Sequence, residues 1–247
     1  MAKNKKWILA AVAVLAVVLC CWAAWSKWAS TTRIGLVNFQ NYQTASLVKS
    51  NEDNFIEYEE IPLDRLDRLG RYDLVLGFGM GLKITEEQRA QILAAADEGT
   101  PIYIYAATNP ENDICSLDSL TKAGISAYIG NGNKRNYRNM ARYVRQHIDA
   151  KRLFVTPAEE AVESASDVLY HLDEDLSFKT VADYEKYLRE QGIYREKAPK
   201  IAIVGGLNDP FSGNRANIDS LIVSLQNAGM NAVSYTHLRA HETTLHL

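Results

Sequence analysis

The residues best suited to chemistry lie in segment 167–178, where one histidine stands among carboxylates. His171 is followed at intervals of two residues by Asp173 and Asp175. An imidazole beside carboxylates can bind a metal ion or take part in acid–base catalysis. We nominate His171 as a candidate base, with Asp173 orienting it. A lone histidine beside acids near a domain junction can equally be structural, and the sequence leaves both interpretations open.

Three further histidines, His237, His241 and His246, lie close together at the C-terminal end. The first two are four residues apart, as zinc ligands on one helix face would be. However, segment 234–247 differs abruptly in composition, and its SYTHLRAHET run resembles the translated read-through of a sequencing adapter. We therefore expect a non-native tail without a metal site. The native sequence is then expected to stop near Val233, inside a domain, which makes the chain a fragment.

A glycine-rich stretch containing Gly77, Gly79 and Gly81 follows an expected strand and precedes an expected helix. A dinucleotide fingerprint needs G-x-G-x-x-G opening the helix itself, with an acid about 20 residues further on. Here the helix is expected to begin only at Thr85, so we interpret the stretch as a strand-to-helix turn. Loops at the carboxyl ends of parallel strands remain the default ligand pocket.

The helix expected over residues 133–149 interleaves cations with aromatic residues, which could suggest a phosphate or nucleic-acid site. Its apolar residues share one face. A net charge of −3 gives no reason to expect nucleic acid as a partner. We expect the arginines to occupy the opposite, solvated face of the helix: Arg138, Arg142 and Arg145.

The composition is that of an ordinary globular chain, with 47% apolar and 23% charged residues. A chain of 247 residues has room for an anchor, one full α/β domain and part of a second. Cys20 and Cys21 lie in an N-terminal apolar run, which leaves Cys115 alone in the rest of the chain. We interpret Cys115 as a small buried residue rather than a nucleophile.

Residues 7–25, from Trp7 to Trp25, contain no charge and follow three lysines. At about 1.5 Å per residue they are close to the roughly 30 Å of a bilayer core. We expect residues 1–30 to form a cytoplasmic stub and a single-pass transmembrane helix, with a periplasmic soluble part. A cleaved signal peptide is the competing interpretation, but it needs a shorter apolar core.

Short apolar strands alternate with helices between residues 31 and 166, which predicts an α/β domain with a flavodoxin-like or Rossmann-like open parallel sheet. Thr85 and Gln88 form an expected capping box. Strands are expected over residues 34–39, 55–61, 72–77, 101–107 and 125–129, and helices over 41–51, 64–69, 85–97, 117–122 and 133–149.

Residues 167–198 are expected to form a connecting segment that includes a helix over 181–191. Residues 199–233 are expected to begin a second, truncated α/β domain. An apolar strand over 201–204 leads through turn residues into a helix with Asn214 as its N-cap and Gly229 as its stop. Another strand is expected to start at Asn231.

These patterns resemble the N-terminal part of the cobaltochelatase large subunit (CobN) family, whose relatives include the H subunit of magnesium chelatase. The resemblance covers roughly residues 128–233 and rests on three segments. The first is Tyr128-Ile-Gly130 followed by Asn136-Tyr-Arg-Asn139-Met-Ala-Arg142-Tyr143. The second is Tyr170-His171-Leu172-Asp173 with Phe178 and Tyr184, where Leu172 replaces the proline of the family's Y-H-P-D segment. The third is the strand–loop–helix that opens the next domain, with Asn217, Asp219, Leu221-Ile222 and Gly229.

The resemblance implies a tetrapyrrole substrate, a divalent metal ion (Co or Fe), and ATP hydrolysed by separate AAA+ partner subunits. The chain has no G-x-x-x-x-G-K-[ST] loop of its own, which fits that division of labour. The role would be cobalt insertion in cobalamin biosynthesis. With an N-terminal anchor the chain is more similar to membrane-attached members found with haem-uptake proteins, whose implied role is handling haem or removing its iron. The family's active-site regions are expected beyond Val233.

A function of a different class, ligand binding without catalysis, also remains open. An anchored α/β domain could sense or present a small ligand without catalysing a reaction, and nothing in residues 33–127 excludes such a binding module.

Overall fold

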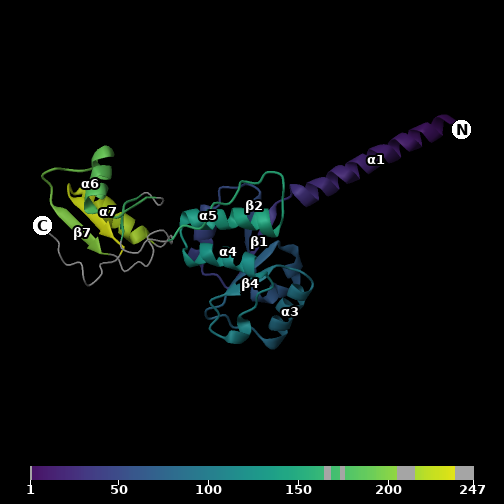
Figure 1. Ribbon diagram of the computed structural model, residues 1–247, viewed down its shortest axis with the longest axis horizontal. Coiled ribbons are helices and arrows are strands. Elements are labelled where there is room, and N and C mark those ends of the chain that lie inside the picture. Colours follow the sequence, from purple (N-terminus) through teal and green to yellow (C-terminus); the bar gives the residue numbers. More distant parts are fainter. Residues whose placement is uncertain (1, 164–167, 173–175, 205–214, 237–247) are drawn as a thin grey trace. The chain divides into compact units, whose positions relative to one another are not determined.

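The computed structural model describes residues 2–163, 168–172, 176–204 and 215–236, with the side chains of the first helix described from Val12 onward. The chain forms two compact units (Figure 1). Unit 1 comprises Met1–Phe39, Glu52–Ala123 and Met140–Glu159, and unit 2 comprises Gln40–Asn51, Gly124–Asn139 and Glu160–Leu247. Among the described residues, each unit contains one four-stranded sheet.

The sheet of unit 1 is parallel throughout and has the strand order β2-β1-β3-β4. This order matches the beginning of a doubly wound sheet, so the predicted α/β fold with a parallel sheet is confirmed. The inner strands are buried along nearly their whole length, as the apolar runs of the sequence indicated. The strands are β1 (Thr32–Val37), β2 (Ile56–Glu60), β3 (Leu74–Phe78) and β4 (Ile102–Tyr105).

The connections of unit 1 pack apolar side chains onto this sheet. The 3-10 helix η1 (Leu63–Arg71) contributes Leu66 and Leu69, and helix α3 (Glu86–Asp97) contributes Ile92. Thr85 caps α3, and the predicted capping box with Gln88 is present. The short 3-10 helix η2 (Pro110–Asn112) follows β4.

Three further helical segments are α2 (Asn41–Ser50), α4 (Ser119–Gly130) and α5 (Lys134–Tyr143), and a π-helical segment η3 (Val144–Ile148) continues α5. Helix α4 corrects the prediction of a strand over residues 125–129. Ile125 and Tyr128 are buried three residues apart, which is a helical spacing, and Gly124 does not end the helix. Asp118 accepts hydrogen bonds from the amides of Leu120 and Thr121 and so begins the helix.

The sheet of unit 2 is mixed and has the order β6-β5-β8-β7. Strands β7 and β8 are parallel, whereas β5 is antiparallel to both β8 and β6. Helix α7 packs on this sheet through Ile222, against Ile203 and Ala232. The elements are β5 (Leu169–Tyr170), β6 (Ser177–Phe178), α6 (Val181–Glu190), β7 (Lys200–Val204), α7 (Ala216–Asn227) and β8 (Asn231–Tyr235).

Two details of unit 2 bear on the sequence predictions. Gly229 follows α7 with φ of 84°, the left-handed conformation expected of a helix stop. The N-cap of α7 is Arg215, while Asn214 lies outside the described residues.

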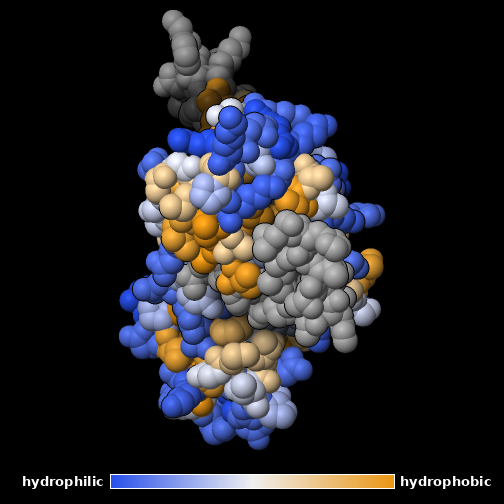
Figure 2. Space-filling model, turned by 90° about the vertical axis from the view of Figure 1, so that its left-hand side faces the viewer, coloured by the Kyte–Doolittle hydropathy of each residue, from blue (hydrophilic) through white to orange (hydrophobic). Residues whose placement is uncertain are grey.

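Strand β7 forms one edge of the sheet and leaves Ile201 and Val204 exposed. Figure 2 shows apolar residues in orange gathered between hydrophilic ones on one face of the molecule.

Helix α1 (Ala2–Trp28) corrects the prediction of a membrane anchor. In the part of the chain that the structure describes, no helix has both the length and the apolar character needed to cross a membrane. The predicted transmembrane helix over residues 7–25 and the predicted single-pass membrane localisation are therefore contradicted.

Candidate functional site

His171, the nominated base, directly follows β5 and is buried, with 2% of its surface exposed. Its Nε2 lies 2.7 Å from Nε2 of Gln226 on α7, and it accepts a hydrogen bond from this amide nitrogen, which can only donate. The backbone carbonyl of His171 accepts a hydrogen bond from Nη2 of Arg215. Helix α7 and its N-cap residue therefore hold His171 through both its ring and its backbone.

Two tyrosines of α6 surround the imidazole on another side. The ring centroids of Tyr184 and Tyr187 lie 6.1 and 5.9 Å from that of His171. The Tyr184 hydroxyl donates to the Ala232 carbonyl of β8 at 3.0 Å, and burial raises the pKa of Tyr184. Thr180 caps α6 by accepting from the Asp183 amide. Helix α6 is thus fixed to the sheet in a position that presents aromatic rings to His171.

Arg215 is buried as well, with 2% of its surface exposed. Its Nε and Nη2 each lie 2.8 Å from Oδ1 of Asp219, one helical turn further on. Its guanidinium carbon lies 5.0 Å from the ring centroid of the fully buried Tyr170. Burial raises the pKa of Tyr170, and the positive charge of Arg215 opposes that rise. The cation is therefore compensated by one carboxylate and one aromatic face.

We call these residues the His171 cluster: Tyr170, His171, Tyr184, Tyr187, Arg215, Asp219 and Gln226. The side-chain amide of Gln226 holds Nε2 of the His171 ring. The predicted partner Asp173 lies outside the described residues, so its pairing with His171 stays a prediction. His237, His241 and His246 also lie outside them.

Sequence reasoning did not nominate Arg215 or Gln226, although the sequence contains a signal for both. Arg215, Asp219 and Gln226 are spaced at i, i+4 and i+11, which is one face of a helix, and the buried Ile222 lies on that face. Polar residues that share a helix face with the core must be buried and must therefore find partners. The expected helix indicates which residues share a face. It does not indicate which residues elsewhere in the chain contact them.

Asn136, part of the first family-like segment, serves as a clamp within unit 2. Its side chain is fully buried. It donates to the Val162 carbonyl at 2.7 Å and accepts from the Val162 amide at 2.9 Å. It also donates to the Asn131 carbonyl at 2.6 Å. An amide that pairs with both backbone groups of one residue acts like a neighbouring strand, so Asn136 fixes the extended segment around Val162.

The glycine-rich loop lies at the carboxyl edge of the sheet of unit 1, between β3 and α3. Asn38 follows β1 with φ of 60° and donates from its side chain to the Phe78 carbonyl at 2.7 Å. Gly79 is required by close approach, since an added Cβ would lie 2.6 Å from Cα of Ala107. Three aromatic rings pack at this edge with centroids 5.5–6.3 Å apart: Phe39, Phe78 and Tyr105.

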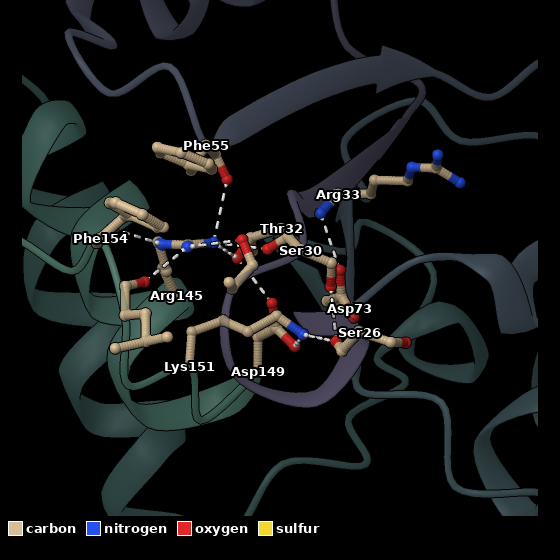
Figure 3. A network of polar contacts seen from close by, with 12 residues as sticks. Ser26, Ser30, Thr32, Arg33, Phe55, Asp73, Arg145, Asp149, Lys151 and Phe154 are labelled. Atoms are coloured by element: carbon tan, nitrogen blue, oxygen red, sulfur yellow. Dashed lines mark hydrogen bonds and ion pairs between the residues drawn. The ribbon is translucent and has the colours of Figure 1, made fainter. Parts of the chain in front are cut away.

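Arg145 is completely buried in unit 1, which corrects the expectation that it lies on a solvated helix face. Its guanidinium donates to the Thr32 hydroxyl and to five backbone carbonyls at 2.9–3.4 Å (Figure 3). Burial lowers the pKa of Arg145, while nearby carboxylates oppose that change. The five carbonyls belong to Ala29, Ser30, Phe55, Leu153 and Phe154.

The same network extends to Asp149 and the end of α1 (Figure 3). Asp149 accepts from the Thr32 hydroxyl at 2.6 Å and lies 2.9 Å from Nζ of Lys151. Lys151 also donates to the Ser26 carbonyl at 3.2 Å. The Trp28 carbonyl accepts from two backbone amides of the segment that follows Lys151. This network joins α1, β1 and the segment after η3, so its role is architectural.

Within the described ranges there is no group of three or more His, Cys, Asp or Glu residues that could hold a metal ion. Cys115 is half-buried, and its Sγ lies 3.9 Å from the Leu117 carbonyl oxygen. In the chelatase reading the metal is a substrate rather than a resident ion.

Comparison with known proteins bears on residues 126–246, which match the family model described as CobN/Magnesium Chelatase. No curated protein matches the chain. Among solved structures the chain is similar to the catalytic subunit of cobaltochelatase from Mycobacterium tuberculosis, with a TM-score of 0.56 and 14% sequence identity. The similarity covers 83% of this chain but 16% of that subunit. At such low identity it shows a shared fold.

The fold and the site define an α/β protein whose second unit buries a histidine–arginine cluster. The family match contains every residue of the His171 cluster, together with Asn136 and Arg145. The resemblance predicted from the sequence is thereby confirmed: residues 126–246 of the chain match the CobN/magnesium chelatase family model.

Proposed function

We propose that this chain serves a CobN-like chelatase by helping to bind a tetrapyrrole from which, or into which, a divalent metal ion is moved. The observation that carries the proposal is the family match over residues 126–246, which contains the whole His171 cluster. Cobalt insertion and removal of iron from haem are both compatible with the family. ATP would be hydrolysed by separate AAA+ partner subunits.

The geometry of the His171 cluster suits a role in proton handling. Metal exchange in a tetrapyrrole requires protons to leave or join the pyrrole nitrogens, and an imidazole can carry them near neutral pH. Because His171 is 2% exposed, the proposal requires the cluster to open when the macrocycle binds. In the open form the imidazole would face the substrate while Arg215 continues to hold the backbone carbonyl of His171.

Tetrapyrrole binding is tested by titrating the whole chain with haem and, separately, with a metal-free porphyrin, and by following the visible absorption of the macrocycle. We expect saturable binding of at least one of them, and about tenfold weaker binding by His171→Ala, the loss of one strong polar contact. The matched control is His147→Ala, because His147 is an exposed histidine in unit 1. Unchanged affinity in His171→Ala would remove His171 from the proposal.

Turnover is tested with a longer polypeptide that contains these residues, since the chain covers 16% of the cobaltochelatase subunit. That protein is mixed with AAA+ partner subunits, ATP and either Co²⁺ with a metal-free macrocycle or haem alone. Product formed in one mixture only would identify the direction of metal transfer. Saturable binding without turnover in either mixture would favour a non-enzymatic ligand-binding module.

A further inference from the structure

A cavity of about 400 Å³ lies in unit 1 at the amino-terminal ends of β1 and β3. It is at the opposite edge of the sheet from the glycine-rich loop, and it is separate from the His171 cluster of unit 2. Its volume is within the range of small-molecule sites. The lining residues come from the end of α1, the turn after it, the start of β1, the end of η1 and the turn before β3: Trp25, Ser30, Thr31, Arg33, Arg71 and Asp73.

Arg33 brings a positive charge to this cavity. Its backbone amide donates to Oδ2 of Asp73, the one acidic side chain of the lining, at 2.8 Å. Its guanidinium extends away from that carboxylate (Figure 3). Among the described residues no side-chain ion pair involves Arg33. A guanidinium held at a cavity wall without a carboxylate partner favours an anionic ligand.

Arg71 supplies a second guanidinium whose position is fixed by its neighbours. It pairs with the carboxylate of Glu59, and its guanidinium carbon lies 4.9 Å from the ring centroid of Tyr72. These contacts order the side chain without burying it, because 39% of its surface remains exposed. Little conformational entropy would then be lost when Arg71 binds a ligand.

The C-terminal end of α1 would by itself disfavour an anion, because the carbonyls of a helix end carry partial negative charge. Here those carbonyls are occupied by donors. Lys151 donates to Ser26, and Arg145 donates to Ala29 and Ser30. Two buried or half-buried cations thus offset the helix end, and the repulsion on this side of the cavity is reduced.

We propose that this cavity binds a small ligand through an oxyanion, either a carboxylate or a phosphate, held between Arg33 and Arg71 with Trp25 as the apolar wall. Guanidinium groups match the planar oxygens of both anions. The site does not depend on the proposed chelatase function, because it shares no residue with the His171 cluster.

The proposal is tested on the whole chain by titration with inorganic phosphate and, separately, with benzoate at constant ionic strength. Nuclear magnetic resonance follows the Trp25 indole N–H and the Arg33 and Arg71 Nε–H signals. We expect saturable shifts at these three groups with at least one anion. Phosphate alone would identify a phosphate site, and tighter benzoate binding would identify a carboxylate on an apolar ring.

The variant Arg33→Gln is expected to weaken binding about tenfold, the effect of losing one charge-assisted contact. The matched control is Arg68→Gln, which removes the same charge from the exposed face of η1 near its pair Asp67. Arg71→Gln should weaken binding as Arg33→Gln does, and thermal unfolding checks that both variants fold. Equal weakening by Arg68→Gln, or no saturable shift in the native chain with either anion, would overturn the proposal.

Discussion

Each unit of this protein contains a buried arginine, and the two are compensated in different ways. Arg145 of unit 1 donates to five backbone carbonyls and to the Thr32 hydroxyl, which in turn donates to Asp149. Arg215 of unit 2 is paired with the side chain of Asp219, lies over the ring of Tyr170, and donates to the backbone carbonyl of His171.

This difference indicates which of the two arginines can change its contacts while its unit stays folded. Backbone carbonyls cannot leave Arg145 unless the segments that carry them separate, so that network is bound to the integrity of unit 1. Side chains such as Asp219 can turn to new rotamers while α7 stays folded. A cluster held by side chains therefore suits a site that opens for a ligand, whereas a guanidinium held by the backbone suits architecture.

The largest effect is expected from Arg145→Met. This change removes the donors and leaves several buried carbonyls unpaired, each of which carries a desolvation cost. We expect a loss of at least about 3 kcal/mol in the free energy of unfolding, measured by urea denaturation. Arg145→Lys should restore less than half, because an ammonium has three donors in place of five. A loss as small as that of Arg68→Gln would show that the network is not structural.

A smaller effect is expected from Arg215→Met, because 29% of the Asp219 side chain is exposed and can be solvated when its partner is lost. We expect a loss of about 2 kcal/mol in urea denaturation. The double variant Arg215→Met/Asp219→Asn should recover about 1 kcal/mol, since it removes the unpaired carboxylate. Strict additivity of the two changes would contradict the proposed pairing and would weaken the contrast with Arg145.

The smallest effect is expected on the pH dependence of the free energy of unfolding, and it involves Asp73 at the edge of the Arg145 network. Burial raises the pKa of Asp73, the hydrogen bond from the Arg33 amide opposes that rise, and the charge of Asp149 adds to it. The folded protein therefore binds this proton more tightly than the unfolded chain. The resulting stabilisation is fully present below the unfolded pKa of about 3.9 and is lost as pH rises through the folded pKa.

Urea denaturation at a series of pH values tests this linkage. Asp73→Asn should remove part of the decline in stability between pH about 4 and neutrality, because the amide cannot ionise and can still accept from Arg33. The matched control Asp67→Asn changes an exposed acid of η1 and should leave the pH profile as it is. An unchanged profile in Asp73→Asn would show that Asp73 does not carry the effect.

Much of the secondary structure was determined by the sequence over short distances. The capping box of Thr85 and Gln88, the left-handed Gly229 and the buried strands of the parallel sheet all follow from residues within a few positions of one another. The error over residues 125–129 has the same origin. A short apolar run fits a strand or a buried helix, and burial of Ile125 and Tyr128 on one face decided for the helix.

The candidate site was predicted in part. His171 stood out because it is a lone histidine among acids, and the family resemblance pointed to the same segment. Its partners Gln226 and Arg215 lie 55 and 44 positions away, so no local pattern could assign them. The helical spacing of Arg215, Asp219 and Gln226 was present in the sequence, but the sequence analysis did not use it.

The tertiary structure alone decided where Arg145 points. By sequence it is one of several arginines on an amphipathic helix, and a solvated face is the usual outcome. Its acceptors lie up to 116 positions away along the chain, at the end of α1 and the starts of two strands. A helix pattern records which residues are polar, but a buried cation is stable only where distant backbone carbonyls converge on it, and that convergence exists only in the folded chain.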